Sequence, residues 1–67
     1  MTIVFQFDTD EEEDYAELFE DKLAAFLASD RIKHNGKYYK ITSKIFDYTH
    51  LEEELTVIAE LERNISF

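Results

Sequence analysis

The chain has 67 residues and a net charge of −9, with 45% hydrophobic and 15% aromatic residues. This length allows a single domain, residues 1–67, and the aromatic content is typical of a folded chain rather than a disordered one. Because the chain has no cysteine, disulfides are excluded; we expect a cytoplasmic protein without a signal peptide or a membrane span.

Charge is unevenly distributed along the chain. Residues 1–30 are strongly acidic, residues 31–46 carry five basic residues and no acid, and residues 47–67 are acidic again. The net negative charge of the whole chain repels phosphate at long range, so we do not expect nucleic acid as a partner.

The first predicted element is a strand over residues 2–7. Ile3, Phe5 and Phe7 alternate with Val4 and Gln6, which places three large apolar side chains on one face. That face is expected to meet the core, and Val4 is expected to point away from it.

A helix is predicted next, over residues 10–29. Thr9 and Glu12 have the spacing of a capping box, and the acids that follow Thr9 suit the positive end of a helix dipole. Apolar residues then recur in steps of three and four, which is typical of one helical stripe. They are Tyr15, Leu18, Phe19, Leu23, Phe26 and Leu27.

A hairpin follows, with Asn35-Gly36 as its turn. Asn-Gly supplies the two positive-φ residues of a type I′ turn, and the resulting register places Ile32, Tyr39 and Ile41 on one face. Continued alternation to residue 48 places Tyr38, Lys40, Lys44, Phe46 and Tyr48 on the opposite face. A register slip across residues 42–44, such as a bulge, would instead move Phe46 inward.

The last strand is predicted over residues 55–62, after a polar connection over residues 48–54. Leu55, Val57 and Ala59 would face inward, and Ile58 outward. The fold class is therefore α+β with the element order β-α-β-β-β. One helix would cover one face of a four-stranded mixed sheet in the spatial order 2-3-4-1, with the first and last strands parallel. The alternative is that the first strand pairs beside residues 31–34, a segment that is short for this role.

No catalytic, cofactor or metal site is expected. His34 and His50 lack the spacing of metal ligands, no serine lies in a nucleophile motif, and Gly36 alone cannot form a phosphate loop. We expect polar surface roles for both histidines, no small-molecule substrate and no enzymatic activity.

The leading functional hypothesis is a protein-interaction module that binds itself, as a homodimer, or another protein. One helix leaves the second sheet face uncovered, and exposed apolar patches usually mark interfaces. The predicted interface residues are Val4, Tyr38, Lys40, Lys44, Phe46, Tyr48 and Ile58.

Two alternatives belong to other classes. The first is an inhibitor that mimics nucleic acid by presenting acids along the predicted helix. Those acids are Asp10, Glu11, Glu12, Glu13, Asp14, Glu17, Glu20 and Asp21. The second is direct binding of single-stranded nucleic acid through the basic hairpin, with Tyr38 among its lysines.

Overall fold

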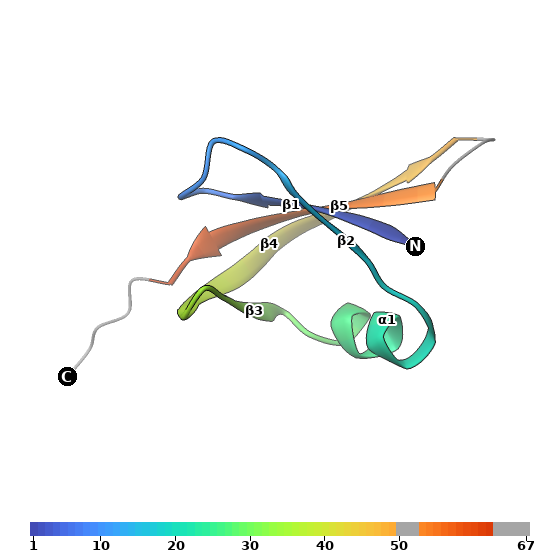
Figure 1. The fold of residues 1–67 in the computed structure, drawn as a ribbon, viewed down its shortest axis with the longest axis horizontal. Coiled ribbons are helices and arrows are strands. Elements are labelled where there is room, and N and C mark those ends of the chain that lie inside the picture. The colour runs from blue at the N-terminus through green and yellow to red at the C-terminus, as the bar shows by residue number, and fades with distance from the viewer. Residues whose placement is uncertain (50–52, 63–67) are drawn as a thin grey trace.

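The structure is a computed structural model that describes residues 1–49 and 53–62. One helix and a five-stranded mixed sheet make up the described part of the chain (Figure 1). The elements are β1 (Thr2–Phe7), β2 (Asp14–Glu17), α1 (Glu20–Leu27), β3 (Arg31–His34), β4 (Lys37–Tyr48) and β5 (Glu53–Leu61).

The strand order is β2-β1-β5-β4-β3. The four strands predicted from the sequence have the predicted neighbours and directions: β5 pairs antiparallel with β4 and parallel with β1. The prediction of four strands is wrong, because β2 adds a fifth strand beside β1.

The prediction of a helix over residues 10–29 is also wrong, because α1 covers only Glu20–Leu27. The predicted capping box does not form: the Thr9 hydroxyl is hydrogen-bonded to the Tyr39 hydroxyl, at 2.8 Å. The chain instead turns after β1, where the Asp10 amide donates to the Phe7 carbonyl at 3.1 Å.

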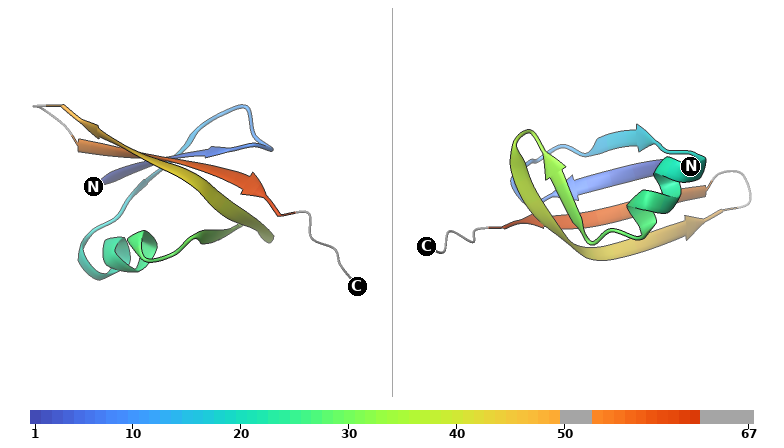
Figure 2. Two further views of the ribbon diagram at one scale, coloured as in Figure 1. Left: turned by 180° about the vertical axis from the view of Figure 1, so that it is seen from behind. Right: turned by 90° about the horizontal axis from the view of Figure 1, so that it is seen from below.

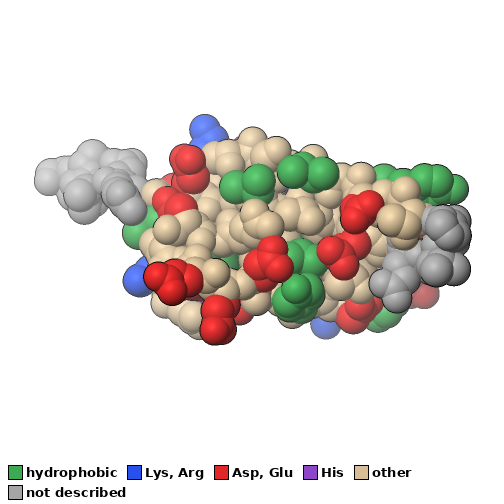
Figure 3. Space-filling view, turned by 90° about the horizontal axis from the view of Figure 1, so that it is seen from above, with side chains coloured by type: hydrophobic (Ala, Val, Ile, Leu, Met, Phe, Trp, Pro, Cys, Tyr) green, Lys and Arg blue, Asp and Glu red, His purple; other side chains and the backbone are tan. Residues whose placement is uncertain are grey.

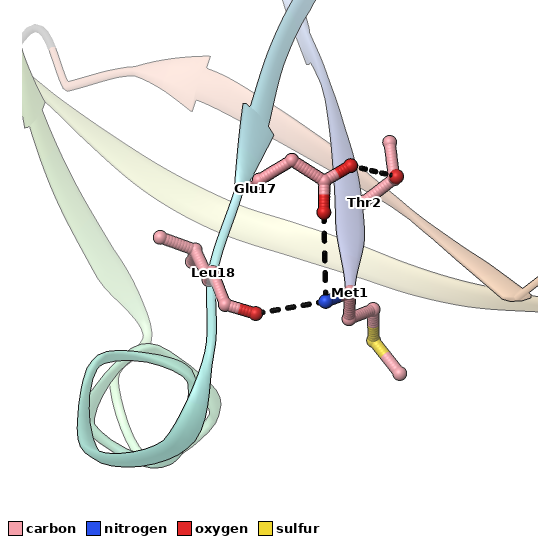
Figure 4. A network of polar contacts seen from close by, with 4 residues as sticks. All are labelled: Met1, Thr2, Glu17 and Leu18. Atoms are coloured by element: carbon pink, nitrogen blue, oxygen red, sulfur yellow. Dashed lines mark hydrogen bonds and ion pairs between the residues drawn. The ribbon is translucent and has the colours of Figure 1, made fainter.

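Pairing with β1 explains why residues 14–17 are extended. Without β2, the edge of β1 opposite β5 would keep unpaired backbone groups, which a buried strand does not tolerate. The Met1 amino group also donates to the Leu18 carbonyl at 2.9 Å and lies 3.6 Å from a Glu17 carboxylate oxygen (Figure 4). The Thr2 hydroxyl donates to the same carboxylate, so these contacts hold the end of the pairing at which Thr2 is opposite Glu17.

The core lies between α1 and one face of the sheet. Ile3, Leu55 and Val57 are buried there, and Leu23 and Phe26 of α1 pack against them. A second cluster of Phe7, Tyr39 and Ala59 continues the core toward the other end of the same face. We refer to this as the helix face and to the opposite side as the helix-free face.

A β-bulge interrupts β4 between Ile41 and Ser43. Ile41 is opposite Ala59 before the bulge, whereas Lys44 is opposite Val57 after it. Because directly opposed residues share a face, the bulge moves every second side chain of the later half of β4 onto the helix face. Alternation without a bulge had placed them on the other face.

The β3–β4 hairpin curls over the helix face, so β3 and α1 lie on the same side of the sheet (Figure 2). The predicted Asn-Gly turn is confirmed by positive φ values of 51° at Asn35 and 76° at Gly36. The curl stacks the His34 ring on Phe7, with centroids 4.6 Å apart. Two segments that are distant in the sequence therefore meet at this end of the sheet.

Candidate functional site

The predicted interface residues do not form one surface. Tyr38, Lys40 and Ile58 lie on the helix-free face, as expected from the alternation. Val4 points the same way but is only 2% exposed, so it offers no contact surface. Figure 3 shows the helix-free face, where apolar groups lie apart and carboxylates lie between them.

The placement of Lys44, Phe46 and Tyr48 on the helix-free face is wrong, because the bulge shifts their register. Lys44 is opposite Val57 and Phe46 is opposite Leu55, which are both core residues. Thr42-Ser43 carries no glycine or other bulge signature, which is why alternation alone assigned the wrong face.

Lys44 has a structural role on the helix face. Its ammonium group donates to the carbonyls of Leu27 (3.0 Å) and Ser29 (3.3 Å), and it lies 5.7 Å from the centre of the Phe26 ring. The last turn of α1 has no basic residue of its own. Lys44 therefore supplies the positive charge that favours a helix C-terminus.

The later half of β4 has an open edge. β3 pairs only with Lys37–Lys40, and the Ile41 amide donates to the carbonyl of Asp30. Beyond that point, no strand in the described part of the chain pairs with the edge of residues 42–48 that faces away from β5. Alternate backbone groups along this edge are available to another strand.

Exposed apolar side chains accompany this edge. Ile45 and Phe46 are each 51% exposed, and Tyr48 is 75% exposed. The rings of Phe46 and Tyr48 are 6.1 Å apart, so they form one aromatic pair on the helix face. We call residues 42–48 the open edge of β4.

The loop from Asp8 to Glu13 borders an acidic hollow of about 700 Å³. Phe7, Tyr15 and Ile58 contribute its apolar part. The acids around it come from the loop and from β5, and not from a helix. They are Asp8, Asp10, Glu11, Glu12, Glu13 and Glu60.

Glu13 fixes one side of the acidic hollow. It accepts a hydrogen bond from the Gln6 amide at 2.7 Å and another from the Tyr15 hydroxyl at 3.1 Å. The bond to Glu13 raises the pKa of Tyr15 above its ordinary value, because the carboxylate stabilises the protonated phenol.

The nucleic-acid mimic was predicted to present its acids on a helix, and this premise is wrong. Of the eight acids assigned to that helix, only Glu20 and Asp21 lie on α1. Asp14 and Glu17 belong to β2, and the rest belong to the loop before it.

The basic hairpin is largely engaged with the protein itself. Arg31 forms a two-bond ion pair with Glu62, at 2.8 and 2.7 Å. This pairing lowers the pKa of Glu62 and raises that of Arg31. Arg31 and Lys33 also lie 5.8 and 5.5 Å from the centre of the Tyr38 ring, so two of the chain's own cations flank this aromatic side chain.

His34 lies in a cluster that the sequence did not reveal. Its Nε2 atom is 3.3 Å from Asp14 Oδ2, and ligand atoms of Asp10, Asp14 and His34 all lie within 4.8 Å of one another. Asp14 and His34 are twenty positions apart in the sequence, and the curl of the hairpin brings them together. His50, the other histidine, lies outside the described residues.

Among residues 1–49 and 53–62, no helix has the length and apolar composition needed to cross a membrane. Comparison with known proteins gave no similarity to report: no family model, no curated protein and no solved structure matches this chain.

Proposed function

We propose that this protein is a non-enzymatic interaction module that pairs with a second copy of itself through the open edge of β4. The observation that supports the proposal is the unpaired edge of residues 42–48, with Ile45, Phe46 and Tyr48 exposed beside it. Antiparallel addition of a strand would satisfy the backbone groups of this edge and cover these side chains.

Charge favours a second copy as the occupant. The open edge carries one cation, Lys44, and one anion, Asp47, in a chain whose net charge is −9. In a two-fold antiparallel pair centred on Ile45, Lys44 would oppose Phe46 of the second copy and Asp47 would oppose Ser43. No like charges then face each other across this edge, so the pairing avoids direct repulsion between opposed side chains.

Size favours association as well. A domain of this length buries only about 60% of the surface that its unfolded chain exposes. A continuous sheet through two copies would bury further apolar surface, which small folds without disulfides commonly need. The proposal places this association in the cytoplasm, the compartment that fits a chain without cysteine.

The test is the solution mass by light scattering across a range of concentrations. We expect a dimer that Phe46→Asp weakens by at least about tenfold, because a charge replaces a central aromatic contact. Tyr38→Asp is the matched control: it makes the same change on the helix-free face and should leave the dimer intact. A monomer at all concentrations would refute the proposal, and dissociation by Tyr38→Asp alone would assign association to the helix-free face.

A second candidate function rests on the acidic hollow. Its lining combines six acids with the apolar residues Phe7, Tyr15 and Ile58. This combination suits a basic segment of another protein, as an inhibitor of a nucleic-acid-binding enzyme would require. Binding there would weaken strongly with salt, whereas the β4 dimer should persist in high salt. Measuring association at low and high salt therefore separates the two functions.

A further inference from the structure

We propose that Asp10, Asp14 and His34 form a binding site for a divalent transition-metal ion of the Zn²⁺ type. The three residues come from different segments, namely the loop after β1, β2 and the end of β3. They are the one group of this kind among the described residues. The site is separate from the open edge of β4 and does not depend on the proposed dimer.

The donor atoms are spaced for a single ion. Zn²⁺ binds imidazole nitrogen and carboxylate oxygen at about 2.0 to 2.2 Å, so two ligands of a tetrahedral ion lie about 3.3 Å apart. His34 Nε2 and Asp14 Oδ2 are already separated by 3.3 Å. The donor atoms of all three residues lie within 4.8 Å of one another, and a side-chain rotation of the exposed Asp10 would close the remaining gap.

The histidine is held in place before any ion binds. Its ring lies nearly parallel to that of Phe7, with an angle of 10° between the planes and centroids 4.6 Å apart. His34 is 31% exposed and Asp14 is 47% exposed. His34 Nε2 lies 3.3 Å from Asp14 Oδ2 and also 3.3 Å from the Asn35 side-chain amide nitrogen, so a bound ion would replace the contact with Asn35. Stacking on Phe7 restricts the ring before the ion binds, so that little conformational freedom is lost on binding.

Solvent has access to the site from one side. Asp10 and Asp14 line a hollow of about 410 Å³ together with Thr9, Glu11 and Glu12. An ion can enter from this hollow, and water can fill the fourth ligand position. Three protein ligands and one open position are a common Zn²⁺ arrangement. The imidazole ligand favours a transition metal over Mg²⁺ or Ca²⁺, which prefer oxygen ligands.

A bound ion would link the two edge strands of the sheet. β2 and β3 are at opposite ends of the strand order, yet Asp14 and His34 belong to them. The ion would hold the curl of the hairpin closed, so metal binding should raise the thermal midpoint of unfolding by mass action.

The experiment uses the full chain without a polyhistidine tag, and Zn²⁺ alone as the probe. Isothermal titration should show one Zn²⁺ per chain, and the unfolding temperature should rise with Zn²⁺ and return with a chelator. His34→Ala and the isosteric Asp14→Asn should each weaken binding at least about tenfold. His50→Ala is the matched control and should bind as the unchanged chain does.

NMR spectra of the imidazole nitrogens test the same site in the unchanged chain, so the result does not depend on whether a variant folds. In the unchanged chain, Zn²⁺ should shift the Nε2 signal of His34, and an equal concentration of Mg²⁺ should not. Absence of a His34 shift, equal binding by His34→Ala, or equal binding of Zn²⁺ and Mg²⁺ would each overturn the proposal, because the ion would then be held by the acidic loop alone or not at all.

Discussion

Lys44 provides the sharpest test of the bulge in β4, because the two possible registers give opposite predictions for its replacement. On the helix face, its ammonium group donates to the Leu27 and Ser29 carbonyls. On the helix-free face, it would have been an ordinary exposed lysine. We predict that Lys44→Met destabilises the protein, although methionine has a similar length and a favourable helix-face environment.

The expected loss is about 1 kcal/mol. A cation at a helix C-terminus contributes about 0.3 to 1 kcal/mol, and hydrogen bonds from a charged donor contribute more where solvent is excluded. Because the Lys44 side chain is exposed, the larger contribution of a solvent-excluded hydrogen bond does not apply, and the helix C-terminal contribution sets the estimate. For a domain of this size, 1 kcal/mol lowers the thermal midpoint by about 4 to 8 °C.

Urea unfolding followed by circular dichroism measures this loss. Lys40→Met is the matched control, because Lys40 lies on the helix-free face opposite Glu60, and it should change stability by less than about 0.5 kcal/mol. The difference between the two variants should shrink in high salt, which screens the helix dipole. Equal effects of the two replacements would refute the bulged register.

Two further predictions concern the core and the ion pair. Val57 is fully buried on the central strand, so Val57→Ala should cost about 2 to 3 kcal/mol in urea unfolding, whereas Thr56→Ala, at the next position on the other face, should cost less than half of that. Arg31 lowers the pKa of Glu62 below its ordinary value near 4.5. The stability this pair contributes should therefore be present above that pH and be lost as the pH falls through the lower folded pKa. The free energies of unfolding of the unchanged chain and of Glu62→Gln should therefore become equal in acid. A difference between them that stays constant down to pH 2 would contradict this.

Local patterns predicted the antiparallel meander and its parallel neighbour. Asn35-Gly36 defines the hairpin register through its backbone geometry, and the alternation in residues 55–61 identifies the central strand. The meander leaves one free edge on β5 and one on β3, and β1 is expected beside β5 because β3 is only four residues long. These features depend on residues that are close in sequence or on simple connection rules.

The fold of residues 8–19 depends on distant contacts, and the sequence pattern misled there. Tyr15 and Leu18 fit a helical stripe, and the acids before them suit a helix start. However, residues 14–17 pair with the second edge of β1, and the Thr9 hydroxyl is hydrogen-bonded to the Tyr39 hydroxyl at 2.8 Å. Helix propensity amounts to a few tenths of a kcal/mol per residue, which is too little to outweigh a paired edge strand.

Both proposed sites lie at the edges of the sheet, which explains why the sequence did not show them. Alternation assigns side chains to the two faces of a strand, so the sequence predicts an interface on a sheet face. It does not show where a neighbouring strand ends, so the open edge of β4 follows only from the short β3. Nor does it show how far a sheet curls, and only the curl brings His34 to Asp14. In a sheet this small, the strand ends and the curl decide which polar and apolar groups remain free to bind a partner.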